Sequence, residues 1–433
     1  MVEIANSAVV RRALLKDSIG GRPQAGAASP DRDTLAPLGD IAASYWRKLA
    51  ERAVEPNGYY LPDWELAVNA FARGRTGASA LGAWADAPAV QDGTTSLIGL
   101  VPVISLWCAY KIPLPALVSA DPYGTLSTPL IDRDMANDAV AGLMLEARKA
   151  GAHALILRDV PLDGAAMKIF TELLQKDGRR PLVLQSHVRA CLDATRDADE
   201  LLRDALGPKK LKELRRQRHR LAEHGAVRFD VARTPTDVAS ALEIFLHLEA
   251  SGWKAKRGTA LMQDEGDASF VRRAAKALAE IGQCEIVTLR AGDTAVAAAI
   301  VLRHLDRAFY FKLGVDERFA KLSPGVQLTL DLTRHLCADP AMAMADSTAG
   351  ADHPMINPIW RGRLAIGDVL IPLRRNDPMV SLIHAAMTLR HNLRRYRGRI
   401  ENDIGAAPTD VRPEAARGSQ FCGGGIFRVD GKQ

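Results

Sequence analysis

Cysteine is scarce in this sequence, and its five residues never form a CxxC pair. Zinc sites and redox motifs use cysteines at short spacing, and small secreted domains use even numbers of them. An odd number of scattered cysteines argues against a metal centre and a disulfide framework, and it favours a reducing compartment. We therefore expect a cytoplasmic protein that binds no metal.

Long apolar runs are also missing. No run reaches the roughly 20 residues that a helix needs to cross a bilayer. Arg11 and Arg12 resemble the start of a twin-arginine export signal, but a polar stretch rich in glycine, proline and alanine follows in place of an apolar segment. We therefore expect neither a transmembrane segment nor export.

Several catalytic signatures are absent. The chain contains no GxxxxGK[ST] phosphate loop, no GxGxxG strand–helix turn, no GxSxG nucleophile motif and no HExxH zinc motif. Kinases and ATPases of the P-loop type, dinucleotide-dependent oxidoreductases, serine hydrolases and zinc hydrolases therefore have no support in the sequence. Another pattern must indicate the function.

Positive charge is concentrated in two segments of a chain whose net charge is +6. Residues 209–220 hold seven Lys or Arg and one Glu, and residues 374–400 hold seven Arg and one Asp. Three interpretations of 209–224 stay open: a solvated connector helix buried along its leucines, a rim for an anion such as a nucleotide phosphate, or a nucleic-acid contact. The segment lacks aromatic residues for base stacking, which weakens the third interpretation.

A chain of 433 residues is too long for one ordinary core. We expect disordered ends at 1–40 and 401–433, α/β domains at 41–195 and 225–375, a basic connector helix at 196–224 and a basic helix at 376–400. The two domains show the same order of elements. This order suggests a duplicated α/β unit.

Hydrophobic periodicity, caps and turn residues predict the individual elements. In the first half we expect helices at 45–52, 62–71, 134–149 and 164–176, and strands at 79–84, 96–106, 153–160 and 181–187. In the second half we expect helices at 236–250, 267–281, 324–338 and 382–398, and strands at 227–231, 284–289, 294–302, 308–313, 342–346 and 366–371. Residues 119–132 form a turn-rich stretch.

The stretch 309–333 carries the most informative local pattern. An aromatic strand ends at Gly314, and Ser323-Pro324-Gly325 then begins a helix. Ser323 is a favoured N-cap, Pro324 suits the first helical position, and Gly325 keeps side-chain bulk away from the helix start. An uncovered helix N-terminus offers free N–H groups and the positive end of the dipole to an anion. The alternative is an ordinary capped helix.

Polar residues near this stretch are candidates for the chemistry. Glu249 and Lys254 flank a helix end, Lys312 lies on the aromatic strand, and Asp346 ends a strand, where a carboxylate could act as a general base. For Asp346 the alternative is a turn cap. Trp253 is a substrate platform or a core residue, and His353 is a substrate contact or a structural histidine.

Three segments carry a resemblance to a known family: LEASGWKAKRGTAL, AFYFKLGVDERFAKLSPGVQLTLDL and ADSTAGADHPMINPIW. Together they resemble the GNAT-fold acyltransferases of the CelD/BcsL-like branch, which is associated with cellulose and exopolysaccharide biosynthesis and related to the FemABX aminoacyl-transferases. The resemblance is specific over 200–375. It implies an α/β (α+β) fold of tandem GNAT-like domains, each a mixed, mostly antiparallel sheet flanked by helices.

The resemblance also implies a donor site. In GNAT enzymes a splayed strand accepts the pantetheine arm, and the next loop and helix start hold the CoA pyrophosphate. The matching residues here are Leu313, Gly314, Val315, Lys321, Leu322, Ser323, Pro324, Gly325 and Val326. The usual loop is [QR]xxGx[GA], whereas 320–325 contain one glycine. The corresponding stretch of the first half, 119–132, lacks a similar helix start, so we expect one donor site.

The implied reaction is acyl transfer from acetyl-CoA or another acyl-CoA to an amine or hydroxyl of a small-molecule or glycan acceptor. Backbone N–H groups would stabilise the oxyanion, and a carboxylate or water would take the proton. Asp346 is the first candidate for the base and Glu249 the second, with Lys312 as a further catalytic candidate; Trp253, Lys254 and His353 would contact substrate. Two alternatives remain: a FemABX-like transferase that uses aminoacyl-tRNA, and a non-catalytic partner of a polysaccharide export system.

Overall fold

The structure is a computed structural model that describes residues 35–74, 77–86, 95–120, 123–252 and 258–405, with side chains to residue 394. Most of the predicted disordered ends, and also Trp253 and Lys254, lie outside the described residues. Two parts of those ends differ from the prediction. A 3₁₀ turn, η2 (Leu38–Asp40), forms before residue 41, and the last helix continues to Gly405 rather than ending at 400.

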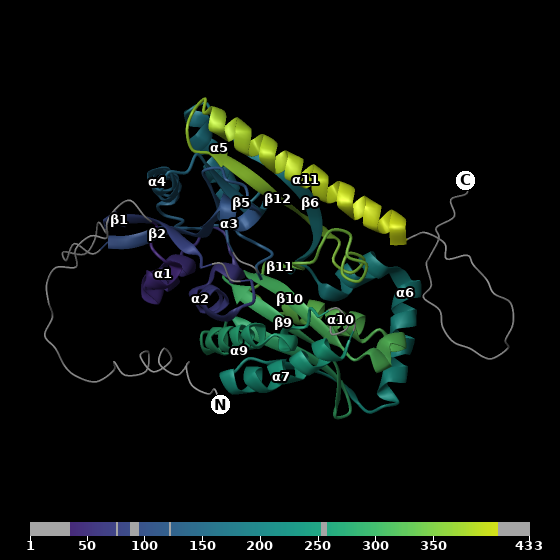
Figure 1. Cartoon of the computed structure of the whole chain (residues 1–433). Coiled ribbons are helices and arrows are strands. Elements are labelled where there is room, and N and C mark those ends of the chain that lie inside the picture. The colour runs from purple at the N-terminus through teal and green to yellow at the C-terminus, as the bar shows by residue number, and fades with distance from the viewer. Residues whose placement is uncertain (1–34, 75–76, 87–94, 121–122, 253–257, 406–433) are drawn as a thin grey trace, which may run out of the picture. The chain divides into compact units, whose positions relative to one another are not determined.

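The helices and strands follow the predicted order closely (Figure 1). The helices are α1 (Ala43–Glu51), α2 (Pro62–Phe71), α3 (Leu106–Tyr110), α4 (Ala136–Lys149), α5 (Ala165–Lys176), α6 (Ala198–Ala222), α7 (Pro235–Ser251), α9 (Glu265–Glu280), α10 (Pro324–Cys337) and α11 (Pro378–Gly405). Further 3₁₀ turns are η3 (Gly58–Tyr60), η4 (Leu261–Gln263) and η5 (Glu317–Leu322). The strands are β1 (Ser79–Asp86), β2 (Thr95–Ser105), β3 (Ala116–Ser119), β4 (Leu130–Ile131), β5 (Ala154–Pro161), β6 (Leu182–Asp193), β7 (Val227–Ala232), β8 (Cys284–Ala291), β9 (Thr294–His304), β10 (Arg307–Val315), β11 (Met344–Asp346) and β12 (Gly362–Pro372).

All twelve strands of the described chain belong to one sheet. Its order is β1-β2-β3-β5-β12-β6-β11-β10-β9-β8-β7, and β4 pairs with β2. The pairs β3–β5 and β10–β11 are parallel, and the remaining pairs are antiparallel. The predicted mixed, mostly antiparallel sheet flanked by helices is therefore confirmed.

The two central strands, β12 and β6, are exchanged between the halves. β12 comes from the second half and pairs with β5 of the first, whereas β6 comes from the first half and pairs with β11 of the second. The two strands also pair with each other, so the sheet continues from one half into the other. Because the halves share this sheet, the division into domains 41–195 and 225–375 stays a prediction.

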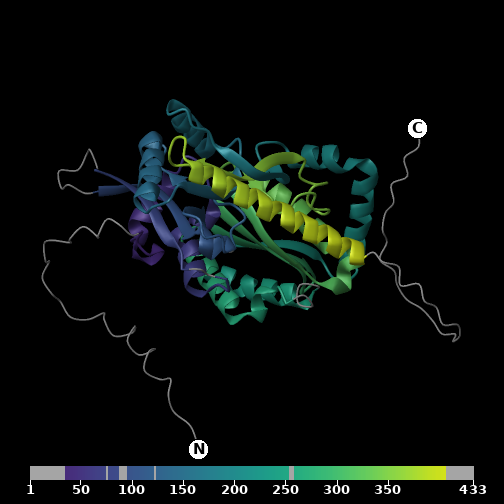
Figure 2. The ribbon, with the colours of Figure 1, turned by 45° about the horizontal axis from the view of Figure 1, so that its top comes forward.

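Strand β9 of the second half is buried on both faces of the sheet. Thr294–His304 is almost continuously apolar, which is typical of a strand covered on both sides. Successive side chains point to opposite faces, so Ile300 and Leu302 pack in one core with α7 and α9, while Val301 packs in the other core with α10. Figures 1 and 2 both show α7 and α9 side by side against the sheet.

Helix α6 lies within the predicted basic connector. It contains a kink at Gly207, whose φ of 68° lies in the left-handed region, and Pro208 follows. Leu214 and Leu221 are buried, as the predicted leucine face requires, and α6 packs against α10 and η5. At its C-terminal end the ring of His224 meets that of Phe319 edge to face at 5.1 Å.

Two regions differ from the predicted elements. The stretch predicted to be rich in turns contains the short strand β4, and the short elements α3 and β3, which were not predicted, come before β4. β6 continues to Asp193, although the predicted strand ends at 187, because its last residues pair with β11 of the distant second half. The chain also divides into two compact units, residues 1–383 and 384–433. Within the second unit only the rest of α11 is described.

Candidate active site

Strands β10 and β11 diverge in the second half. Their parallel pairing ends at Phe309 and Asp346, and the chain turns away at Thr348, a residue with φ of 50°. The Thr348 hydroxyl donates a 2.6 Å hydrogen bond to the Tyr310 carbonyl, which fixes the point of divergence. Beyond this point no strand among the described residues pairs with the edge of β10 that faced β11.

A cavity of about 500 Å³ occupies this opening, lined by β10, the start of α10 and residues 347–356. Eight of the predicted site residues line it: Lys312, Leu313, Val315, Ser323, Pro324, Gly325, Val326 and His353. Gly314, Lys321, Leu322, Glu249 and Asp346 lie nearby without lining it. The structure therefore brings together the strand and helix start that the sequence pattern singles out.

The start of α10 differs in detail from its prediction. Pro324 does take the first helical position, but Ser323 adopts a left-handed conformation (φ 53°) and its side chain makes no capping hydrogen bond. Gly325 is buried rather than exposed, and a Cβ placed there would lie 3.0 Å from Leu313 and 3.2 Å from Val315. The first N–H groups of a helix have no partner within it, and here Gly325 and Val326, which follow Pro324, line the cavity.

Gly314 places helix α7 directly against β10. A Cβ at this position would lie 2.8 Å from the backbone nitrogen of Glu249 and 3.1 Å from the carbonyl oxygen of Phe245. The missing side chain thus permits the close approach of helix and strand that brings Glu249 to Lys312.

Glu249 and Lys312 form an ion pair at the inner wall of the cavity. The Lys312 Nζ lies 3.3 Å from Glu249 Oε1, and Glu249 Oε2 accepts a 3.0 Å hydrogen bond from the Leu261 backbone N–H. The Glu249 side chain is fully buried, whereas that of Lys312 keeps 22% of its surface exposed. Lys312 is therefore the partner whose side chain is partly exposed.

Tyr123 of the first half borders the same ammonium group, with its ring centre 6.0 Å from Lys312 Nζ. Burial, together with a hydrogen bond to Asp267, raises the pKa of this phenol. The sequence marked the neighbourhood of Tyr123 only as a turn. No local pattern could have linked it to a strand almost two hundred residues away.

Asp346 is completely buried and lies outside the cavity. One of its oxygens forms an ion pair with Arg189 of β6, and the other accepts a 2.9 Å hydrogen bond from the Thr348 N–H. Arg189, which the sequence reasoning missed, also donates to the Thr125 carbonyl at 2.6 Å. Catalysis by Asp346 stays a prediction, and these contacts favour a structural role that fixes the Ser347–Thr348 turn.

The other predicted residues fall into separate positions. His353 lines the cavity, its Nδ1 accepts from the Met355 N–H at 3.3 Å, and burial lowers the pKa of its ring. Lys321 is exposed on η5, and Leu322 packs on the core beneath α10. No cluster of three or more metal-binding side chains occurs in the described residues, and none of the described helices could span a membrane.

Comparisons with known proteins give a match for part of the second half of the chain. Residues 208–353 match the model of the Acetyltransferase (GNAT) domain family. No curated protein sequence matches the chain. The narrower CelD/BcsL-like resemblance stays a prediction.

Among solved structures, FemX is similar in fold, with a TM-score of 0.51 and 12% identity over 79% of this chain and 98% of that chain. A C-terminal domain (DUF2156) from Agrobacterium fabrum, described as belonging to a lysylphosphatidylglycerol synthetase, has a TM-score of 0.48 with 13% identity over 79% of this chain and 95% of that one. A tandem GNAT protein from the clavulanic acid biosynthesis pathway has a TM-score of 0.32 with 14% identity over 79% and 98%. Residues 208–353 are thus similar to the GNAT-type acetyltransferase domain family, within a chain whose fold is similar to that of FemX.

Proposed function

We propose that the chain transfers an acyl group from an acyl-CoA to an amine or hydroxyl acceptor in the cavity beside β10. The observation that carries this proposal is the cavity of about 500 Å³ at the divergence of β10 and β11, onto which the start of α10 opens. The family match over 208–353 supports it, because this segment contains both elements.

In this proposal the thioester arm lies along the open edge of β10, and the phosphates lie at the start of α10. The arm would gain backbone hydrogen bonds from a strand edge that has lost its neighbour. The phosphates would gain unpaired N–H groups and the positive end of the helix dipole. Apolar side chains such as Leu313, Val315 and Val326 line the space between these ends.

Lys312 is our candidate for the residue that acts on the reacting carbonyl. When the acceptor attacks the thioester carbon, negative charge develops on the carbonyl oxygen, and a fixed ammonium group would stabilise it. The C–S bond then breaks, the sulfur leaves and takes up a proton as CoA thiol, and the acceptor releases its proton to water. Glu249 would act as a positioning residue, because its carboxylate holds Lys312 but is itself buried.

The second candidate function is transfer from an aminoacyl-tRNA. It is favoured by the fold similarity to FemX together with the exposed basic face of α6, which includes Lys209, Lys210 and Lys212. A role in polysaccharide or cell-envelope biosynthesis and a cytoplasmic location remain predictions from the sequence.

Calorimetric titration separates these functions. We expect acetyl-CoA and CoA to bind with one site per chain, and we expect transfer of radiolabelled acetyl groups into a panel of amines and amino sugars. Saturable binding of aminoacyl-tRNA without CoA binding would replace the proposal by its second candidate. Binding of neither donor would leave a non-catalytic partner as the conclusion.

A further inference from the structure

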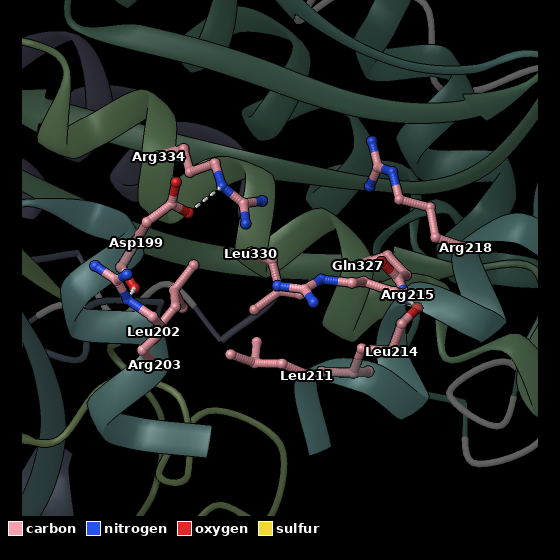
Figure 3. Close-up of a pocket in the computed structure, with 10 residues that line it drawn as sticks. All are labelled: Asp199, Leu202, Arg203, Leu211, Leu214, Arg215, Arg218, Gln327, Leu330 and Arg334. Carbon is pink, nitrogen blue, oxygen red and sulfur yellow. Dashed lines mark hydrogen bonds and ion pairs between the residues drawn. The ribbon is translucent and has the colours of Figure 1, made fainter. Parts of the chain in front are cut away.

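A second cavity, of about 280 Å³, lies between α6 and α10 (Figure 3). Helix α10 contributes Gln327, Leu330 and Arg334, whose spacing places them on one face. Gly325 and Val326 instead line the cavity beside β10, which in our proposal binds the donor and which we call the donor cavity. The two cavities therefore have no lining residue in common.

The second cavity has an apolar wall and four arginines around it. The wall consists of Leu202, Leu211, Leu214 and Leu330, and the arginines are Arg203, Arg215, Arg218 and Arg334. They come from three helical segments, because the kink at Gly207 lets both parts of α6 border the cavity. Figure 3 shows the side chain of Arg215 extending between Leu330 and Leu211.

The carboxylates at this cavity neutralise only part of its charge. Arg218 pairs with Asp331 at 2.8 Å, and Arg334 pairs with Asp199 at 3.0 Å and with Asp331 at 3.3 Å. Arg203 donates to the backbone carbonyl of Asp199, which carries no charge.

Arg215 is the fourth arginine at this cavity. Neither a hydrogen bond nor an ion pair joins its guanidinium to any described part of the chain. Four guanidinium groups thus meet two carboxylates, and a surplus of positive charge faces the cavity.

We propose that this cavity binds the phosphate ester of a small molecule, at a site distinct from the donor cavity. One arginine fork suffices for the two coplanar oxygens of a carboxylate, whereas the three tetrahedral oxygens of a phosphate accept hydrogen bonds from several directions. The arginines come from three helical segments and can therefore donate hydrogen bonds from several directions, as a phosphate requires. The leucine wall matches an apolar organic group on the ester.

Titration calorimetry in a low-salt buffer without phosphate tests this site, with phenyl phosphate as the probe. We expect saturable binding at one site, about tenfold tighter than that of inorganic phosphate because of the leucine wall. Arg215→Gln should weaken binding by about tenfold or more, since it removes a charge-assisted donor. Arg216→Gln is the matched control, because Arg216 is the neighbouring exposed arginine of α6 and lines no part of the cavity.

Several results would overturn the proposal. Absence of saturable binding would do so directly. Equal losses in Arg215→Gln and Arg216→Gln would show diffuse attraction to a basic helix, and equal affinity for phenyl phosphate and sulfate would show an unselective anion site. Loss of binding in Ala320→Glu, a variant at the mouth of the donor cavity, would place the probe there instead. If the protein does not bind CoA, the proposed function fails, but the proposal of a phosphate ester site does not depend on that result.

Discussion

The Nζ atom of Lys312 lies 3.3 Å from Oε1 of Glu249, and this contact joins strand β10 to helix α7 at the wall of the donor cavity. It pairs a wholly buried carboxylate with a lysine whose side chain is partly exposed. The same contact thus serves the fold through Glu249 and, in our proposal, the reaction through Lys312.

Replacement of both partners separates these two roles. Lys312→Met should destabilise the fold by about 3 kcal/mol, because it removes a cation beside a buried carboxylate. Adding Glu249→Gln should recover much of that loss, since the amide can still accept from the Leu261 N–H. Urea unfolding measures the stability. Acyl transfer should stay low in the double variant, and restored transfer would remove Lys312 from the mechanism.

Gly314 is predicted to be less replaceable than Gly325. Alanine at 314 would place its Cβ 2.8 Å from a backbone atom of α7, so the helix must shift, whereas alanine at 325 meets side-chain atoms at 3.0 Å or more. We expect Gly314→Ala to cost about 2 kcal/mol and Gly325→Ala clearly less. Thermal unfolding of both variants checks this order, and equal costs would contradict the close approach of α7 to β10.

His304 should make stability depend on pH. Its Nδ1 accepts from the Asn57 N–H and its Nε2 donates to the Ala50 carbonyl, both at 2.9 Å, so the folded protein needs the neutral ring. Burial lowers the pKa of His304 from 6.5 to about 4. The unfolded chain binds the proton first as pH falls, so stability is lost from pH 6.5 towards 4, by about 3 kcal/mol in total. Urea unfolding across this range should show the slope, and His304→Gln should reduce it. If the dependence of stability on pH has the same slope in His304→Gln as in the wild type, His304 is not its source.

Glu285 should contribute stability that acid removes. Burial alone would raise the pKa of this carboxyl, but hydrogen bonds from His335 and Arg233 and the charge of Arg303 outweigh it and bring the pKa to about 2. The contribution is complete above the unfolded pKa of 4.5 and disappears as pH falls towards 2. At neutral pH we expect Glu285→Gln to cost about 3 kcal/mol in urea unfolding, with a smaller difference in acid. If the stability difference between the wild type and Glu285→Gln is the same at neutral pH and in acid, the ionised Glu285 does not make this contribution.

Local pattern predicted the stretch around the donor cavity because its determinants are neighbours in the sequence. The aromatic strand and the helix start at Pro324 act through their own backbone and lie where the pattern placed them. Gly314 also lies in the strand, but its close contact with the distant helix α7 is not visible in the local pattern. The local pattern did not show that Leu313 and Val315 also leave little space for a side chain at Gly325.

The sequence did not predict contacts between residues that are distant in the chain. The exchange of β6 and β12, the Arg189–Asp346 ion pair and the position of Tyr123 beside Lys312 all join residues that are distant in the chain. The sequence shows which strands are apolar, but it does not show which partner each one selects when both halves offer similar edges.

Binding of CoA to variants of Ala320 tests the central claim most directly. Ala320 is exposed on η5 and lines the mouth of the donor cavity, so a longer side chain there should spare the fold. A ligand at a hundred times its dissociation constant stabilises a protein by about 2.7 kcal/mol, which thermal unfolding detects. We expect CoA to raise the melting temperature of the wild type and of Ala320→Gln, and Ala320→Glu to lose most of this shift through repulsion of the phosphates. A full CoA-induced shift in Ala320→Glu would contradict our placement of the donor.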